Sequence, residues 1–439
     1  MAQDRDELNK RRAAREARRK QREAQKKKLR MQLTFVAIAL IACVAGIFLL
    51  TRSDAPETTE TPTVPVTTVP ETTAAPTEAA SRFSQDNTVI HIRAAGDLNV
   101  TDKTVGAADT DLGYDYTRPF LDVAALLSDA DLTIMNFEGN VCGEPYGSAT
   151  RSAPKEMIEA LANAGVDVLQ MANSYSIYNG MIGLAQTLDN IRQMGIEPIG
   201  AYANAAEFRK AKGYTICEVQ GVKVALVPFT KGMGSLGLPA GSEDCVNVLY
   251  VDYATTYRDV DEDKIKSILK SVASEEPDIT IALLHWGSEY NDVISDTQKS
   301  ILNLMKENGV DAIIGTHSHM VHEISYDAST GFLVAYSLGD FFGDGTRGGT
   351  NYSIILDLEI TKDSETGETR ITDYSYTPIY ILSEGESADG YRRVVRIRET
   401  MAAFDVNYLD KVTKSAYNSM QTSLTRIADR TDPPEPTED

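Results

Sequence analysis

The chain has 439 residues, enough for one large globular domain or two smaller ones, and its formal net charge at pH 7 is −21. Basic side chains concentrate in residues 1–30, so the remainder is strongly acidic and would repel DNA or RNA, which excludes a nucleic-acid partner for the main domain. Four cysteines are too few for a disulfide framework, so we expect Cys142, Cys217 and Cys245 to be buried free thiols, with one disulfide among them as the alternative.

The N-terminal region has the pattern of a membrane anchor. Residues 1–30 form a basic, helix-prone segment that lacks an apolar stripe and cannot build a core. Residues 33–50 follow without a charged side chain, and these 18 residues can span the hydrocarbon region of a bilayer. We therefore predict a transmembrane helix within residues 31–51, with the basic segment in the cytoplasm. A cleaved signal peptide is the competing interpretation, but the basic region is long for one.

A low-complexity segment follows the predicted anchor. Residues 53–81 are rich in Thr, Pro, Glu, Ala and Val and contain no aromatic side chain, which is typical of a disordered or polyproline-like linker. We place this Thr/Pro-rich linker at residues 52–86, and the 29 residues of its low-complexity part, 53–81, could reach about 90 Å at roughly 3.1 Å per residue. The order predicts a single-pass protein of the cell membrane, with its N-terminus cytoplasmic and its main domain extracellular.

The composition becomes globular from about residue 87, and we expect this domain to extend to residue 385. Apolar strand-like runs alternate with helical patterns, which indicates an α/β architecture with buried strands. Strands are expected at residues 89–97, 132–140, 166–174, 196–201, 222–230, 279–287 and 310–319, and helices at residues 120–130, 155–165, 183–195, 264–272 and 297–308.

The pattern changes after Gly331, where apolar residues alternate with a period of two. This alternation predicts antiparallel strands at residues 332–340, 351–360 and 370–382, with a hairpin turn at residues 364–368. We treat residues 386–439 as a separate C-terminal segment. It is expected to hold a last helix near residues 409–428 and an acidic tail.

Polar side chains suited to binding metals stand at the carboxyl ends of the predicted strands. The chain has only five histidines, and three of them lie between residues 317 and 322. Carboxylate, amide and imidazole groups are the ligand set of a divalent-metal hydrolase, whereas the competing interpretation is loop residues satisfied by backbone groups. Ligands collect at strand ends in α/β sheets. The strand-end residues are Asp97, Asn136, Glu138, Asn173, His285, His317 and His319.

Six sequence blocks in this order resemble those of the CapA-type poly-γ-glutamate capsule biosynthesis proteins, a branch of the calcineurin-like metallophosphatase superfamily. The blocks are Gly96-Asp97, Asn136-Phe137-Glu138, Ala172-Asn173 with Gly180, His285-Trp286-Gly287 with Glu289-Tyr290, Gly315-x-His317-x-His319, and Tyr336-Ser337-Leu338-Gly339. The resemblance implies a metallophosphatase-like β-sandwich flanked by helices. It also implies a divalent ion, Mn, Fe, Zn or Mg, at the positions of Asp97, Glu138, His285, His317 and His319. Candidate substrate-binding residues are Asn136, Asn173, Trp286, Glu289 and Tyr290.

The chain departs from the family pattern at four positions. Ser174 stands where a metal-binding Asn is expected, and Tyr175 stands where the superfamily places its catalytic His. Tyr178 replaces an Asp, and Asp340 replaces an Asn. A phenol with a reference pKa of about 10 is a poor proton donor near neutral pH, so no catalytic residue is assigned.

These observations favour a membrane-anchored, extracellular protein of capsule biosynthesis, export or anchoring, whose metallophosphatase-like site lacks the usual Asn-His. The expected partners are the membrane, an anionic exported polymer and other capsule-synthesis membrane proteins. A metal-dependent hydrolase of cell-envelope polymer is the alternative, and an ectodomain with decayed function is the third interpretation. An acidic domain needs a bound cation or a local basic patch to hold polyglutamate, because like charges repel.

Overall fold

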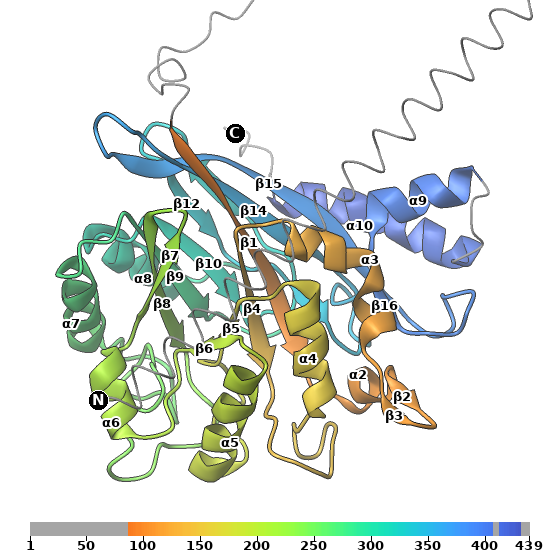
Figure 1. Ribbon diagram of the computed structural model, residues 1–439, viewed down its shortest axis with the longest axis horizontal. Coiled ribbons are helices and arrows are strands. Elements are labelled where there is room, and N and C mark those ends of the chain that lie inside the picture. The colour runs from red at the N-terminus through yellow and green to blue at the C-terminus, as the bar shows by residue number, and fades with distance from the viewer. Residues whose placement is uncertain (1–86, 407–411, 432–439) are drawn as a thin grey trace, which may run out of the picture. The chain divides into compact units, whose positions relative to one another are not determined.

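The computed structural model describes residues 87–406 and 412–431, which fold as two β-sheets packed face to face (Figure 1). The strands of the first sheet run in the order β16-β15-β14-β1-β4-β5-β6, and β13 also pairs with β1. The second sheet has the order β11-β12-β10-β9-β8-β7. Helices cover the outer faces, so the predicted α/β sandwich flanked by helices is confirmed in these residues.

In the first sheet, strand β1 has parallel strands on one side and the antiparallel strand β14 on the other. Strands β4, β5 and β6 run parallel to β1, whereas β14 pairs with β1 in the antiparallel sense. Its strands are β1 (Thr88–Asn99), β4 (Leu132–Glu138), β5 (Val168–Gln170), β6 (Glu197–Ile199), β13 (Asp340–Phe342), β14 (Tyr352–Lys362), β15 (Thr369–Leu382) and β16 (Arg393–Arg396).

The second sheet has a parallel centre with one antiparallel strand at each edge. Strands β8, β9, β10 and β12 are parallel neighbours, and β7 and β11 close the edges. Its strands are β7 (Thr215–Val219), β8 (Val222–Thr230), β9 (Ile279–His285), β10 (Ala312–Thr316), β11 (Ile324–Asp327) and β12 (Phe332–Ala335). A separate two-stranded sheet pairs β2 (Asp109–Thr110) with β3 (Gly113–Tyr114).

Three hydrophobic cores lie between the layers. Successive residues of a strand face opposite sides of its sheet, so one strand can contribute to two cores. In β9, Ile281 and Leu283 face the core between the sheets, whereas Ala282 and Leu284 face helices α7 (Glu262–Ala273) and α8 (Asp296–Glu307). On the outer side of the first sheet lie α3 (Thr117–Ser128), α4 (Lys155–Ala164) and α5 (Gly180–Gln193). The shorter helices are α2 (Asp102–Gly106) and α6 (Ala205–Ala211).

The C-terminal helices pack against the same inter-sheet core. Helix α9 spans Ile397–Asp405, and α10 spans Lys414–Thr431, which places the last helix a few residues later than its predicted position. Met420 and Ile427 of α10 are buried among residues from both sheets. No helix in residues 87–406 and 412–431 is long and apolar enough to cross a membrane. The predicted anchor and linker lie outside the described residues.

The single antiparallel strand predicted at residues 332–340 does not form. The segment divides into β12, which joins the second sheet parallel to β10, and β13, which pairs with β1 in the first sheet. Between them the chain crosses from one sheet to the other through Tyr336–Gly339. Two glycines permit the crossing: Asp97 N donates to Gly339 O at 3.0 Å, and a Cβ on Gly96 would lie only 1.8 Å from that oxygen. The alternation of apolar and polar residues along a short segment cannot reveal that the chain moves from one sheet to the other.

Two smaller predictions are confirmed in the described residues. The hairpin turn between β14 and β15 is present, where Asp363 N donates to Glu368 O at 2.8 Å. In the described residues, none of Cys142, Cys217 and Cys245 forms a disulfide. Cys217 and Cys245 are buried and Cys142 is half-buried.

Candidate metal centre

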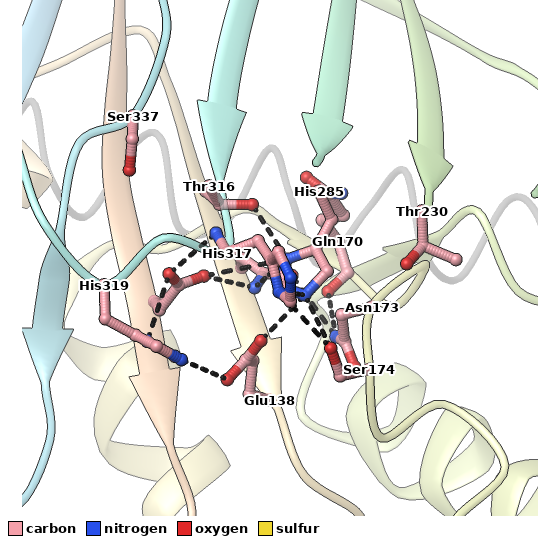
Figure 2. A network of polar contacts seen from close by, with 12 residues as sticks. Glu138, Gln170, Asn173, Ser174, Thr230, His285, Thr316, His317, His319 and Ser337 are labelled. Carbon is pink, nitrogen blue, oxygen red and sulfur yellow. Dashed lines mark hydrogen bonds and ion pairs between the residues drawn. The ribbon is translucent and has the colours of Figure 1, made fainter. Parts of the chain in front are cut away.

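The carboxyl ends of strands from both sheets meet at one site (Figure 2). Asp97 lies near the end of β1, and Glu138 and His285 are the last residues of β4 and β9. His317 and His319 follow directly after β10. The structure thus brings together all five residues for which the sequence predicted metal positions, and each is at most 5% exposed.

The first ligand group consists of Glu138, His285 and His317, whose ligand atoms all lie within 4.8 Å of one another. His285 Nε2 is 2.9 Å from Glu138 Oε1 and 3.0 Å from His317 Nδ1. Ser174 Oγ lies beside the same nitrogens, 3.1 Å from His285 Nε2 and 3.4 Å from His317 Nδ1. The serine therefore occupies the place expected for an Asn ligand and offers one oxygen there.

The second ligand group consists of Asp97, His319 and Asp340, again within 4.8 Å of one another. His319 Nδ1 is 2.8 Å from Asp340 Oδ1 and 3.6 Å from Asp97 Oδ2. Asn99 Nδ2 donates to the same Asp340 oxygen at 2.9 Å. The sequence had marked Asp340 only as a departure from the family pattern. Its place after the Tyr-Ser-Leu-Gly block, beside other strand-end carboxylates, was the signal that could have identified it.

The backbone of the histidine loop aims both rings at the site. His317 and His319 have positive φ angles of 92° and 61°, a region that residues other than glycine rarely adopt. His317 N donates to Asp97 Oδ2 at 3.0 Å, which ties this loop to β1. Thr316 Oγ1 lies 3.0 Å from His285 Nδ1, so Nε2 is the ring nitrogen that faces the first group. Such backbone strain is typical of functional sites.

Two buried asparagines hold the carboxylates in place. Asn136 Nδ2 donates to Asp97 Oδ1 at 2.6 Å. Asn173 Nδ2 donates to Asn136 Oδ1 at 3.2 Å and to Phe137 O at 2.7 Å. Both amides are at most 2% exposed, so in this structure they position ligands, and their substrate-binding role stays a prediction.

The three other candidate substrate-binding residues differ in position. Trp286 is 1% exposed, packs in the core beneath α7 and α8, and donates its indole N–H to Tyr336 O at 3.0 Å. Glu289 and Tyr290 are exposed. The Tyr290 ring stacks on His319, with centroids 5.1 Å apart. Glu289 and Tyr290 are therefore accessible to a ligand at the centre, whereas Trp286 supports the end of β9.

Tyr175 is held next to the first ligand group. Its backbone N–H donates to Asn173 Oδ1 at 3.0 Å, and the guanidinium carbon of Arg151 lies 4.1 Å from the centroid of its ring. Burial, followed by the nearby Glu138 charge, raises the pKa of the Tyr175 hydroxyl above its ordinary value. The phenol therefore keeps its proton at neutral pH and is a weaker acid than a free tyrosine.

The donor set fits a divalent metal ion. Both carboxylate oxygens of Glu138 are buried without a well-directed hydrogen bond in the described residues, although His285 Nε2 lies 2.9 Å away. Burial lowers the pKa values of His285 and His317, so both rings are neutral ligands at pH 7. Burial and the Glu138 charge raise the pKa of Asp97. A cation stabilises the charged form of buried carboxylates crowded in this way, and a bound metal ion would supply that charge.

Metal affinity should fall as the pH is lowered from 8 to 6. Burial raises the pKa of Glu138 to about 7, so below pH 7 an incoming ion must displace a proton from this carboxyl. Above pH 7 the carboxylate is already free. Because the ion must displace this one proton, we expect the apparent metal affinity to fall by an amount that approaches about tenfold per pH unit well below pH 7. Competition with a chelator of known affinity at constant ionic strength measures it, and an affinity that is flat across this range would contradict the assignment of Glu138 as a ligand.

Comparison with known proteins identifies the family. The family model described as bacterial capsule synthesis protein PGA_cap matches residues 91–344, which is more than half of the chain. The chain belongs to the PGA_cap family. The matched region contains all six residues of the two ligand groups. The predicted resemblance to CapA-type proteins is therefore confirmed.

Two characterised relatives bear matching names. This chain is similar to the PGA biosynthesis protein CapA of Bacillus subtilis (strain 168), with 23% identity over 306 residues, covering 66% of this chain and 76% of the relative. The capsule biosynthesis protein CapA of Bacillus anthracis is 26% identical over 239 residues, covering 53% of this chain and 54% of the relative. The chain thus spans about half the length of the second relative.

Among solved structures, the chain resembles the calcineurin-like phosphoesterase YfkN from Bacillus subtilis. The TM-score is 0.38 and the sequence identity is 16%, and the match covers 78% of this chain and 98% of that chain.

Proposed function

We propose that this protein is anchored in the cell membrane and that its extracellular domain acts in the synthesis, export or anchoring of an anionic capsule polymer, poly-γ-glutamate or a related chain. One observation carries the proposal: six buried ligand residues from both sheets converge within the region that matches the PGA_cap family. A divalent ion bound there supplies positive charge and Lewis acidity. The protein residues hold that ion and exclude water from its ligands.

The residues next to the ligand groups favour polymer binding over turnover. Tyr175 keeps its proton at neutral pH because burial raises its pKa, so it would transfer a proton poorly to a leaving group. Ser174 offers a single hydroxyl oxygen near His285 and His317. A hydroxyl is a weaker ligand than an amide carbonyl, so this side of the centre should hold an ion less firmly.

A metal-dependent hydrolase of cell-envelope polymer is the second candidate. The observation in its favour is that the two ligand groups adjoin: His319 Nε2 lies 4.0 Å from Glu138 Oε2. Adjacent divalent ions are typical of enzymes that hydrolyse phosphoesters. Activity would then require a proton donor other than Tyr175.

Deletion of the gene for this protein from its native organism tests the proposal. Loss of the protein should remove the anionic polymer from the cell surface, and the wild-type gene should restore it. His317→Ala should fail to restore the polymer because it removes a ligand. His322→Gln is the matched control, since His322 lies in the same loop but its Nε2 contacts Asn291 O at 2.9 Å instead of a ligand group. Unchanged surface polymer after deletion would contradict the proposal.

The proposed topology makes a separate prediction. Protease added to intact, wall-stripped cells should remove the domain that begins after residue 83 and spare the N-terminal segment, because the basic residues before residue 31 favour the cytoplasm. Antibodies against each end of the chain, used on the digested cells, measure this. A C-terminal domain that is protected until the cells are lysed would rule the orientation out.

A further inference from the structure

Two arginines lie on tyrosine rings beside the metal centre. The guanidinium carbon of Arg151 is 4.1 Å from the centroid of the Tyr175 ring, and that of Arg347 is 4.1 Å from the centroid of the Tyr290 ring. A cation over an aromatic face is attracted by the ring quadrupole, which restricts the orientation of the guanidinium. The two arginines lie in loops that are almost two hundred residues apart in the chain.

Both tyrosines adjoin the ligand groups. Tyr290 stacks on His319 with an angle of 27° between the rings, so the Tyr290 ring contacts both His319 and Arg347. Tyr175 follows Ser174, whose Oγ is 3.1 Å from His285 Nε2. One arginine therefore stands beside the first ligand group, and the other stands beside the second.

Neither arginine is neutralised by a carboxylate in the part of the chain that the structure describes. Arg151 donates one N–H to Val100 O at 3.1 Å, which leaves its other donors available. Arg347 is exposed. Six other arginines of the domain pair with carboxylates within 4.0 Å, namely Arg93, Arg192, Arg392, Arg393, Arg396 and Arg430. Arg151 and Arg347 differ from these six in that their guanidinium donors remain available to a ligand beside the candidate metal centre.

The backbone holds both arginines in place. Asn140 N donates to Arg151 O at 2.7 Å, and Thr350 donates to Arg347 O from its backbone N at 3.2 Å and from its hydroxyl at 2.9 Å. The loop of Arg347 is also fixed at its start, where the buried Arg392 donates to Gly343 O at 3.2 Å. These contacts position the side chains before a ligand arrives, which reduces the entropy lost on binding.

Basic side chains gather at the site, although the domain as a whole is acidic. Lys231 adds a third basic group, with its Nζ donating to Gly287 O at 2.6 Å, and it has no carboxylate within 4.0 Å in the described residues. The exposed Glu289 is one acidic group that faces these cations, since its charge acts on Lys231, Glu138 and Tyr175. The buried carboxylates of Asp97, Glu138 and Asp340 add to its negative charge. Three basic side chains and a divalent ion would together offset these four carboxylates.

We propose that Arg151 and Arg347 bind carboxylate groups of an acidic polymer on either side of the metal centre, which rests on the proposed function. A planar guanidinium can donate two parallel hydrogen bonds to a carboxylate, and repeated carboxylates along one chain would reach both arginines and the ion together. This assignment also gives Tyr175 a role: it is the platform for Arg151 where a catalytic histidine is missing. Phosphate shares the fork geometry, so a phosphate polymer is the competing ligand in the test.

The test measures binding of a fluorescein-labelled, γ-linked glutamate decamer to the full-length protein in detergent with Mn²⁺, by fluorescence anisotropy. R151Q/R347Q should weaken binding about a hundredfold, because each charged hydrogen-bond partner contributes about a factor of ten or more. Its Mn²⁺ content should equal that of wild type, since neither arginine is a ligand. R118Q is the matched control: Arg118 lies 4.3 Å from the Tyr391 ring centroid and has no described contact with the ligand groups.

The outcomes separate this inference from the proposed function. Wild type that binds the decamer, with R151Q/R347Q binding it equally well, overturns the arginine sites and leaves the proposed function standing. Wild type that does not bind the decamer at all overturns the arginine sites, whereas the gene deletion decides the proposed function. Binding of polyphosphate of matched length that is tighter than binding of the decamer, and lost in R151Q/R347Q, overturns the carboxylate assignment. A hundredfold loss with unchanged metal content and an unaffected R118Q supports it.

Discussion

Replacing His317 and His319 together with alanine should remove the bound divalent metal, lowering affinity by more than about a hundredfold. His317 belongs to the group with Glu138 and His285, and His319 belongs to the group with Asp97 and Asp340, so the double replacement takes one ligand from each. Loss of even an outer-sphere partner of a metal ligand typically costs about 10 to 100-fold in affinity, so loss of a direct ligand should cost more. Elemental analysis of the purified proteins, with chelator competition, measures both content and affinity.

His322→Gln provides the matched control for this experiment. His322 is as buried as the two ligands, at 4% exposure, yet it lies in neither ligand group. Circular dichroism of the variants separates loss of metal from loss of fold. Equal metal content in wild type and in the double variant, with the fold intact, would mean that these histidines are not ligands.

Restoring the two missing groups should create phosphodiesterase activity. In Ser174→Asn/Tyr175→His, an amide oxygen would stand near His285 and His317, and an imidazole would replace the phenol next to the same group. Imidazolium gives up its proton about 3.5 pH units more readily than phenol does, and positioned acid–base groups contribute about 10² to 10⁴ in rate. We expect turnover of bis-p-nitrophenyl phosphate with Mn²⁺ to rise by about 10² or more over wild type.

Tyr178→His is the control for placing an imidazole in this loop. Tyr178 is 42% exposed and makes an edge contact with Tyr175, but no described contact joins it to either ligand group. Its replacement should leave turnover at the wild-type level. Strong metal-dependent turnover by wild type, unchanged or reduced in Ser174→Asn/Tyr175→His, would falsify the view that the site has lost its acid.

Much of the fold could be predicted because the spacing of apolar residues within a short segment distinguishes a strand from a helix. The predicted strand at residues 222–230 coincides with β8, and the predicted helix at residues 155–165 ends where Gly165 adopts a φ of 102°. Edge strands β7, β11 and β16 and helix α9 were not predicted. They are short, and their stability comes from the neighbouring strands and cores and not from their own sequence pattern.

The candidate ligand residues could be predicted because strand ends meet at one edge of a sheet. Asp340 was not assigned as a ligand because residues 332–340 were taken as one strand, whereas the chain changes sheets before it. Trp286 shows the value of alternation: it follows His285 directly, so its side chain points the opposite way, into the outer core. Arg151 and Arg347 lie in loops without periodicity, and their tyrosine partners are distant in sequence, so no local pattern could reveal them.

The position of β1 has a consequence for how the protein is made. One edge of this strand pairs with β4, which follows within about fifty residues, but the other pairs with β14, whose first residue is Tyr352. During synthesis from the N-terminus, that edge stays open while some 250 further residues emerge. Open strand edges invite pairing with other chains, so the newly made protein is most vulnerable to aggregation during this interval. A chain that stops at residue 344, where the family match ends, would never close the edge.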